Sequence, residues 1–432
     1  MLKGQFPVEK FASLRTPFYY YDLPLLRRTL DKIRECIEPY PQFHVHYAVK
    51  ANFNGRILQE ISRCGFGADC VSGGEVRAAL QNGFAPESIV YAGVGKSDEE
   101  ILLALDAGIA RFNVESAAEL EVINELALSR GVVAPVSLRV NPDIGAHTHA
   151  NITTGLAENK FGINYEQLPG VIELADSLPG VEYKGLHFHI GSQILEMDDF
   201  VALCNRINVL AEQILRQRRG RLVPAASSAA AVGYSSSAAG AAGAAGVAGS
   251  GVAAGAAAGV AGAAASVLGD INVGGGLGIN YYHPNHLDVA EFSQYFETFA
   301  RHLKLPEGTP VHFELGRSVV APCGSLISRV LYIKEGTTRR FAIIDASMTE
   351  LIRPALYKAY HRVENISSYE PEEVYDVVGP VCESSDVFAK GVSIDKCHRG
   401  DFIAIRSAGA YGESMSSQYN CRPLPACFFK ED

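Results

Sequence analysis

The sequence predicts a (β/α)8 barrel joined to a second, mostly β domain, and three features lead to this prediction. Eight short runs of β-branched and aromatic residues occur before residue 317, and stretches with helical periodicity separate them. Beyond residue 317 the chain changes to strand-like runs with turns between them. Its 432 residues are too many for one small core and suit a large barrel with a second domain.

The eight strand-like runs lie at residues 44–50, 67–72, 88–93, 111–116, 135–141, 183–190, 271–276 and 311–316. Helical patterns such as SGGEVRAALQNG, SDEEILLALDAG and SAAELEVINELALSRG stand between them and end near glycine, as helix C-termini commonly do. Eight strands that alternate with helices are typical of a closed barrel. A doubly wound open sheet is the alternative, and the number of strands disfavours it.

The rest of the chain predicts the second domain. Its strand-like runs are SLISRVLYIKEG, RRFAIIDAS, EEVYDVVGPVCES and DFIAIRSAGAYG, and only TELIRPALYKAY has helical character. The N-terminal stretch TPFYYYDLP is also strand-like and is expected to join this domain. We therefore expect the barrel to span residues 22–318 and the β-rich domain to combine residues 1–21 with residues 319–432.

A low-complexity segment interrupts the predicted barrel at about residues 222–269, where 48 positions carry no charge and are mostly Ala, Gly, Ser and Val. It is long enough to span a membrane, but Ala and Gly are weakly hydrophobic and no aromatic belt flanks it. The other interpretations are a flexible or partly helical insertion and an artificial segment, and the sequence does not separate these two. We expect the segment to carry no chemistry.

Charge and cysteine content restrict the possible partners and the compartment. The formal net charge of −10 argues against a nucleic-acid-binding protein. The nine cysteines lack close CxxC pairs, which argues against a zinc site and a disulfide framework and fits a reducing cytosol, and we expect no metal. The N-terminus has no apolar core followed by a cleavage site, so we expect a cytoplasmic protein that does not span a membrane.

The barrel prediction indicates where a site should lie, because the C-terminal ends of barrel strands face the active site. The strand ends carry polar residues and glycines, namely Lys50, Ser72, Asn113, Arg139, Asn141, His189, residues 274–276 and Glu314. Lys50 alone, at the end of the apolar run HVHYAVK, is better explained by a strand end that reaches water. The convergence of a lysine, a histidine, a glycine-rich turn and a glutamate favours a functional site.

These residue types together predict a pocket for pyridoxal 5′-phosphate. A lysine amine suits Schiff-base chemistry, and the glycines of VGGGLGI allow a phosphate to approach backbone N–H groups closely. In FELGR an acid can pair with a pyridinium nitrogen and an arginine can bind an anion, and HFHIGSQ offers a flat imidazole and a serine. Each of these signals taken singly is more often structural than functional.

Six motifs in order give the chain a family resemblance: YAVKAN, GLHFHIGSQ, NVGGGLGI, FELGR, CESSD and AGAYG. The chain resembles the alanine-racemase-fold pyridoxal-phosphate decarboxylases, and among them the diaminopimelate decarboxylase family. The resemblance covers nearly the whole chain except about residues 222–269. It implies cofactor-binding roles for Lys50 as the Schiff-base lysine, His189 against the ring, Glu314 at the pyridine nitrogen, and Ser192, Gly275, Gly276 and Arg317 near the phosphate.

The resemblance also implies a substrate site and a partner. Arg317, Arg353, Tyr357, Glu383 and Tyr411 would contact the substrate, Tyr411 would contact the cofactor as well, and Cys382 would be the general acid. In this family the residues that match Cys382 and Glu383 reach into the partner subunit, so a homodimer is implied. Three residues depart from the commonest pattern, Ser347 and Ser385 where glycine is usual and Asn280 where aspartate is usual. Serine avoids positive φ, so these departures question the local backbone conformation.

The acid at position 314 argues for decarboxylation rather than racemisation, because related racemases place an arginine there, which weakens the electron sink. Arg353 can bind a distal carboxylate and Glu383 a distal ammonium, a pair of groups that meso-diaminopimelate carries. The expected reaction therefore gives L-lysine and CO2. The alternatives are a decarboxylase of ornithine, lysine or arginine and a non-catalytic homologue that binds the cofactor, while Arg353 could instead form a structural ion pair.

Overall fold

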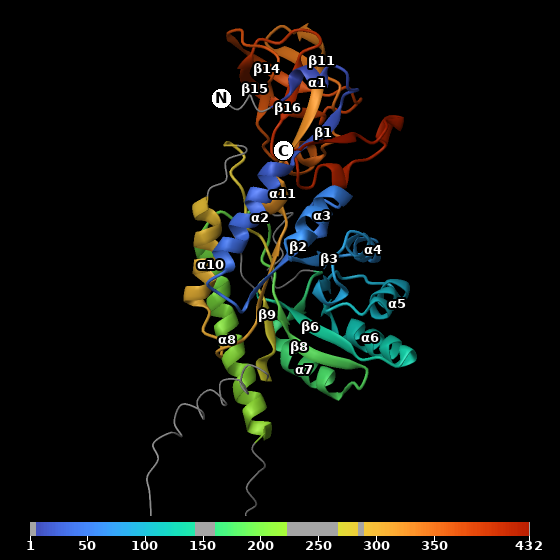
Figure 1. Ribbon diagram of the computed structural model, residues 1–432, viewed down its shortest axis with the longest axis vertical. Helices are drawn as coiled ribbons and strands as arrows, with labels where there is room; N and C mark the ends of the chain where they lie inside the picture. The colour runs from blue at the N-terminus through green and yellow to red at the C-terminus, as the bar shows by residue number, and fades with distance from the viewer. Residues whose placement is uncertain (1–5, 143–159, 223–266, 284–288, 432) are drawn as a thin grey trace, which may run out of the picture.

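The computed structural model describes residues 6–142, 160–222, 267–283 and 289–431 (Figure 1). A barrel with its helices and a separate β-rich unit lie at opposite ends of the long axis. The segment predicted as an insertion falls mostly on residues outside the described ranges. Its two described flanks meet at the base of the barrel, where Arg218 Nη1 donates a hydrogen bond to the Val267 carbonyl at 3.3 Å.

The barrel is closed by eight parallel strands, which confirms the predicted fold class. β2 pairs with β3 and with β10, and the ring continues through β9, β8, β6, β5 and β4 back to β3. Each strand lies at one of the predicted runs: β2 (Phe43–Ala48), β3 (Gly67–Cys70), β4 (Ile89–Tyr91), β5 (Arg111–Val114), β6 (Ala134–Asn141), β8 (Val181–His187), β9 (Asp270–Asn272) and β10 (Val311–Leu315). A further two-residue strand, β7 (Ile163–Asn164), pairs with β6.

Helices surround the barrel and begin and end where their capping residues place them. Ser97 and Glu100 form a capping box at the start of α5, and Gly108 and Gly131 end α5 and α6 with φ of 67°. The helices are α2 (Leu23–Ile37), α3 (Gly55–Arg63), α4 (Gly73–Gln81), α5 (Asp98–Ala107), α6 (Ala117–Arg130), α7 (Leu168–Ser177), α8 (Met197–Leu222) and α10 (Val289–His302). Among the described residues, no helix is long and apolar enough to cross a membrane.

The second sheet contains β1 (Phe18–Asp22), β11 (Gly324–Glu335), β12 (Arg340–Ile344), β13 (Val363–Asn365), β14 (Glu372–Val378), β15 (Val387–Asp395), β16 (Phe402–Ile405) and β17 (Ala426–Lys430). β1 pairs with β11 and β17, so the N-terminal strand joins this sheet as predicted. The sequence did not predict β13, β15 or β17. The predicted helix shortens to α12 (Arg353–Tyr357), and two other short helices are α1 (Val8–Phe11) and α11 (Arg317–Val320).

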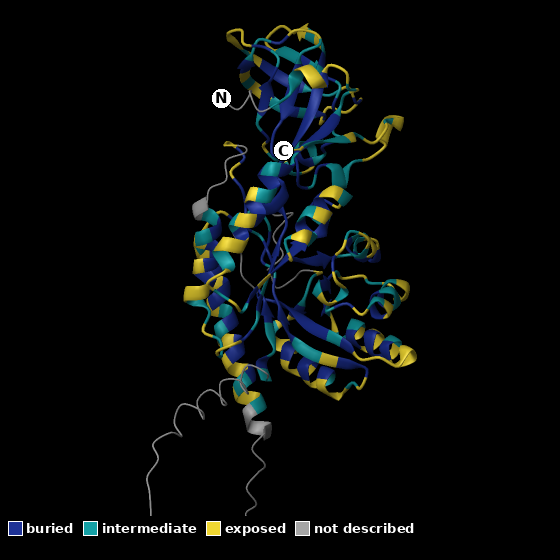
Figure 2. Cartoon of the chain, viewed as in Figure 1, coloured by how far each residue is buried: buried dark blue, intermediate teal, exposed yellow. Residues whose placement is uncertain are grey.

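The packing of β10 shows how the core orients a site residue. Buried strands and the inward faces of the helices form the continuous interior (Figure 2). Phe313 packs outward on the aromatic rings of α10, with centroid distances of 5.0 Å to Phe296 and 5.2 Å to Phe299. Each such pair contributes about 0.5–1.5 kcal/mol beyond its buried area. Because successive strand residues point to opposite faces, the fixed Phe313 turns Glu314 into the barrel.

Candidate active site

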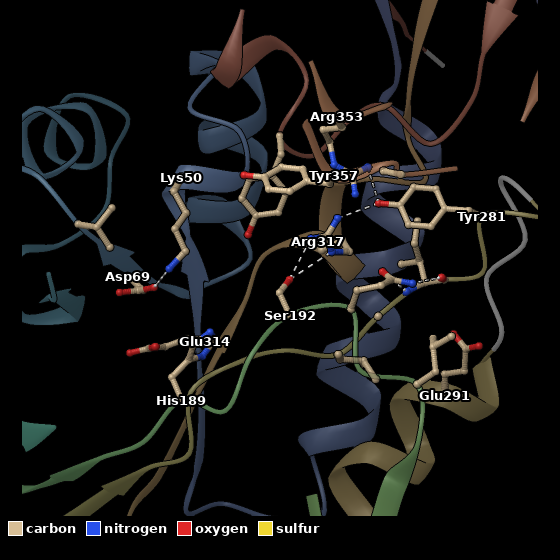
Figure 3. A pocket seen from close by; sticks show the side chains of 18 of the residues that line it. Lys50, Asp69, His189, Ser192, Tyr281, Glu291, Glu314, Arg317, Arg353 and Tyr357 are labelled. Atoms are coloured by element: carbon tan, nitrogen blue, oxygen red, sulfur yellow. Dashed lines mark hydrogen bonds and ion pairs between the residues drawn. The ribbon is translucent and has the colours of Figure 1, made fainter. Parts of the chain in front are cut away.

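A cavity of 890 Å³ lies at the C-terminal ends of the barrel strands, where the sequence predicted a site. The barrel contributes Lys50, His189 and Glu314 to its lining, and the chain beyond the barrel contributes Arg353 and Tyr411. Figure 3 shows two groups of side chains on opposite sides of this cavity: Lys50, Asp69, His189 and Glu314 on one, and Ser192, Arg317, Tyr281 and Arg353 on the other.

Glu314 is a buried carboxylate held by side chains from three other strands of the barrel, β5, β8 and β9. Its Oε1 accepts hydrogen bonds from Asn113 Nδ2 at 3.3 Å and Asn272 Nδ2 at 2.8 Å, and its Oε2 lies 3.1 Å from His187 Nε2. Burial acts to raise the pKa of Glu314, but His187 and then Lys50 lower that pKa by more, so it falls well below its usual range. The barrel interior therefore presents an ionised carboxylate to the cavity.

Lys50 follows β2 on a short 3-10 turn (Val49–Ala51) and leans into the cavity with 38% of its side chain exposed. Its Nζ lies 3.5 Å from Asp69 Oδ2. Burial acts to lower the pKa of Lys50, but Asp69, Tyr411 and Glu314 raise it by more. Burial and then Glu314 raise the pKa of Asp69. One ammonium therefore faces two carboxylates, and Asp69 is a site residue that the sequence reasoning missed.

His189 and the glycines after β9 pack closely together. His189 Nδ1 accepts a hydrogen bond from the Gly275 N–H at 3.3 Å, and burial with Lys50 lowers the histidine pKa well below 6.5, so its ring is neutral. A Cβ on Gly275 would lie 1.8 Å from the Glu314 carbonyl, and Gly276 has a φ of 110°. Only glycine allows this turn to pack on β10. The glycines themselves do not line the cavity, and the first residue after β9 that does so is Leu277.

The opposite side of the cavity holds two arginines. Arg317 Nη2 donates to Ser192 Oγ at 3.0 Å, and its Nη1 donates to Tyr281 Oη at 2.9 Å. Arg353 Nη1 donates to the same phenolic oxygen at 2.9 Å. Both arginines are buried, and among the described residues neither forms an ion pair with a carboxylate. Because these two guanidiniums have no carboxylate partner among the described residues, this side of the cavity is suited to binding anions.

Tyr357 and Tyr411 lie in the cavity lining, as predicted for contacts with a ligand. The Tyr411 N–H donates to the Ala51 carbonyl at 2.8 Å, with a φ of 55° at Tyr411. The Arg317 guanidinium lies over the Tyr411 ring at 4.9 Å. Tyr411 therefore links the chain beyond the barrel to the turn that carries Lys50.

Cys382 and Glu383 do not line the cavity of their own chain. Both are exposed on the loop between β14 and β15, and Glu383 accepts a hydrogen bond from Tyr419 Oη at 2.7 Å. Asp386 holds this loop, because its carboxylate accepts from the N–H groups of Met348 at 2.7 Å and Val381 at 2.9 Å. Action of Cys382 and Glu383 in a partner subunit stays a prediction.

Several of the predicted strand-end residues do not line the cavity, namely Ser72, Asn113, Asn141 and residues 274–276. Ser72 caps α4 instead, with its hydroxyl accepting from the Glu75 N–H at 3.2 Å, because β3 ends at Cys70. The unusual Ser347, Ser385 and Asn280 do not have positive φ, so the concern about local strain does not apply. Among the described residues, no cluster of His, Cys, Asp and Glu could hold a metal ion.

The site residues fit pyridoxal 5′-phosphate. An ionised carboxylate matches a pyridinium nitrogen, and the neutral His189 ring offers a flat face. Arg317 and Ser192 offer donors to a phosphate, and on the other side of the cavity Lys50 extends its amine toward Asp69. A turn that excludes any Cβ brings backbone close to the same wall. The cofactor prediction therefore agrees with the chemistry of the donors.

Comparisons with known proteins agree with this geometry. Residues 26–218 match the family model described as pyridoxal-dependent decarboxylase, pyridoxal binding domain. Diaminopimelate decarboxylase of Bacteroides thetaiotaomicron is 53% identical over 431 residues, covering 100% of both chains, and that of Zymomonas mobilis is 36% identical over 417 residues, covering 96% of this chain and 87% of the relative. The crystal structure of Helicobacter pylori diaminopimelate decarboxylase complexed with L-lysine superposes with a TM-score of 0.81 at 34% identity, covering 98% of this chain and 94% of that one.

Proposed function

The chain belongs to the diaminopimelate decarboxylase family of pyridoxal-dependent decarboxylases, and we propose from this premise how its residues act. The enzyme uses pyridoxal 5′-phosphate to convert meso-diaminopimelate to L-lysine and CO2. The observation that carries the proposal is the arrangement of an ionised Glu314 and a cavity-facing Lys50 opposite two arginines without carboxylate partners. Glu314 and Lys50 therefore hold the reacting part of the cofactor on one side of the cavity, and the arginines bind anionic groups on the other.

The first group of residues holds the cofactor. We assign Lys50 to its covalent attachment, Glu314 to the pyridine nitrogen, His189 to the ring face, and Ser192, Gly275, Gly276 and Arg317 to the phosphate. When bound, pyridoxal phosphate supplies the electron sink for the electrons released with CO2. Glu314 keeps a proton on the ring nitrogen, because its anionic charge is fixed by the hydrogen bonds from β5, β8 and β9.

The second group selects the substrate. Arg353 binds the distal carboxylate of diaminopimelate, and Tyr357 and Tyr411 enclose the chain of the substrate. The support for Arg353 is its buried guanidinium without an ion pair among the described residues, which disfavours the alternative of a structural ion pair. A carboxylate that enters this wall gains charge-assisted hydrogen bonds in a place with little water.

A homodimer completes the site in this proposal. Cys382 of one protomer gives a proton to the α-carbon that loses CO2 in the partner's cavity, and Glu383 binds the distal ammonium there. The exposed position of both residues supports this role. We also propose a cytoplasmic location and a division into a barrel of residues 22–318 and a β-rich domain of residues 1–21 and 319–432.

Analysis of the reaction products tests the assignment of meso-diaminopimelate as the substrate. Purified enzyme with cofactor should form L-lysine from meso-diaminopimelate and should not decarboxylate ornithine, lysine or arginine at a comparable kcat/KM. The reverse preference would overturn the substrate assignment. A chain without residues 222–269, assayed alongside, should keep this activity, since the described flanks of the segment lie at the barrel base, opposite the cavity.

Subunit mixing tests the shared site. Lys50→Ala and Cys382→Ala are each expected to be inactive alone. When the two are unfolded and refolded together in equal amounts, half of the dimers are mixed and each has one intact site, so about a quarter of the wild-type activity should return. Failure to recover activity, with dimers shown to re-form, would contradict a site built across two subunits.

A further inference from the structure

The wall that faces substrate contains a shared hydrogen bond that the proposed function does not use. Arg317 and Arg353 come from α11 and α12, yet each donates an N–H to Tyr281 Oη at 2.9 Å (Figure 3). Tyr281 lies in the loop after β9 and is 8% exposed. Two guanidiniums that bond to the same oxygen atom lie close together and repel each other. Burial and then the charge of Arg317 lower the pKa of Arg353. The phenolic oxygen offsets this repulsion because its two lone pairs accept from both arginines.

His361 fixes the other side of Arg353. Its Nδ1 lies 2.8 Å from the Arg406 carbonyl, and a carbonyl can only accept, so Nδ1 carries the proton. The Nε2 lone pair then accepts from Arg353 Nη1 at 2.8 Å. Burial, followed by Arg353, lowers the pKa of His361 to about 3, so the imidazole stays neutral near neutral pH. The His361 ring also contacts the Tyr281 ring edge to face, with centroids 5.1 Å apart.

We propose that Tyr281 and His361 are positioning residues that hold Arg353 at a fixed distance from Arg317, and so set the length of substrate that the cavity accepts. This inference rests on the proposed function, in which Arg317 faces the cofactor phosphate and Arg353 the distal carboxylate. With Tyr281 between them, the two anion sites cannot drift apart or collapse together. The enzyme then recognises a distal carboxylate only at the end of a chain that spans this gap.

Removal of one hydroxyl tests Tyr281. Tyr281→Phe keeps the ring but frees both arginines, and it should raise KM for meso-diaminopimelate about tenfold or more while kcat changes less than about threefold. Tyr183→Phe is the matched control, because it too removes a hydrogen-bonded tyrosine hydroxyl. The Tyr183 hydroxyl donates to Leu268 O at 3.1 Å, and the ring lies against Arg218 at 4.6 Å, away from the cavity. The control should leave KM unchanged.

Binding of the product without turnover separates this inference from the proposed function. Calorimetry would measure L-lysine, which keeps the distal carboxylate, and 1,5-diaminopentane, which lacks it. If the wild-type enzyme does not prefer L-lysine, the role of Arg353 itself fails. If the wild type prefers L-lysine and Tyr281→Phe retains that preference within twofold, the positioning role of Tyr281 fails. We expect Tyr281→Phe to lose about tenfold in L-lysine affinity and to bind the diamine as before.

Variants of His361 give a second test that does not depend on Tyr281. Glutamine can donate to the Arg406 carbonyl and accept from Arg353, so His361→Gln should keep KM within about threefold of wild type. His361→Leu offers no acceptor and should raise KM about tenfold, with thermal unfolding used to compare how well both variants fold. Equal KM values for the two variants would overturn the positioning role of His361.

Discussion

The mouth and the base of the barrel both gather histidines, acids and arginines, but they pair them differently. At the base, Arg111 Nη2 lies 2.7 Å from Asp270 Oδ2, His312 Nε2 lies 3.3 Å from the same oxygen, and His46 bonds to His312 at 2.9 Å. These residues neutralise one another across β2, β5, β9 and β10. At the mouth, Arg317 and Arg353 find only neutral acceptors among the described residues.

This difference teaches that an unpaired buried charge marks the functional end, whereas a cluster of charges alone does not. Burial of an uncompensated charge is costly, so it persists where a ligand provides the missing partner. The base cluster has an adjoining hollow of 720 Å³, yet its charges are already satisfied within the fold.

Replacement of two ion-paired lysines should give opposite results. Lys50→Ala should lower turnover by about a thousandfold or more, because it removes the amine that holds the cofactor and releases product. Lys96→Met should lower the free energy of unfolding by about 3 kcal/mol and leave kcat nearly unchanged, because Lys96 is bonded to Glu119 at 2.5 Å and to two carbonyls at 2.9 Å. Product formation and chemical unfolding are the measurements, and an inactive, fully folded Lys96→Met would contradict the contrast.

Two carboxylates can be changed to amides of the same shape. Glu314→Gln should lower kcat by about a hundredfold, because the neutral amide no longer favours a proton on the ring nitrogen. Asp270→Asn should lower stability by about 2 kcal/mol through its bonds to Arg111 and His312, with kcat kept. Steady-state kinetics and urea unfolding of both proteins compare the effects, and a large loss of kcat in the Asp270 variant would erase the distinction.

Acid should destabilise the protein through a buried histidine at the base of the barrel and another behind its mouth. His46 at the base and His361 behind the mouth each have a pKa lowered to about 3, and burial is the first cause in both. Between pH 6.5 and 3 the unfolded histidines bind protons that the folded ones do not, so the free energy of unfolding falls as pH falls, by up to about 1.4 kcal/mol per pH unit for each histidine. His46→Gln and His361→Gln should each reduce this slope between pH 7 and pH 5. An unchanged slope in both variants would contradict burial of neutral imidazoles.

The barrel and half of its site could be predicted from local patterns. Apolar runs with β-branched residues located all eight strands, and glycines marked the helix ends at Gly108 and Gly131. The strand-end rule then selected Lys50 and Glu314, because side-chain direction alternates along a strand. The same rule chose Ser72 instead of Asp69 because the predicted strand extended two residues beyond Cys70. Asp69 is the next-to-last residue of β3, so its side chain points to the opposite face from that of Cys70, the last residue.

The hydrogen bonds that join Arg317 and Arg353 to Tyr281 and His361 could not be predicted from local patterns. Tyr281 is 72 positions from Arg353 in the sequence, and nothing near either residue signals that they meet. His361 belongs to none of the sequence motifs, and its importance comes from the Arg406 carbonyl that fixes its tautomer. Such contacts depend on how the second sheet packs against the barrel mouth. They arise from tertiary structure, which sequence periodicity does not encode.

The most direct test of the contrast compares two arginines in one set of measurements. Arg353→Met and Arg111→Met remove one unpaired and one paired guanidinium, and both proteins are measured for KM with meso-diaminopimelate and for the free energy of unfolding. We expect Arg353→Met to raise KM at least about thirtyfold with stability nearly unchanged, and Arg111→Met to lose about 2–3 kcal/mol of stability with KM nearly unchanged. A stability loss at Arg353 without a change in KM, or a KM increase at Arg111, would contradict the account.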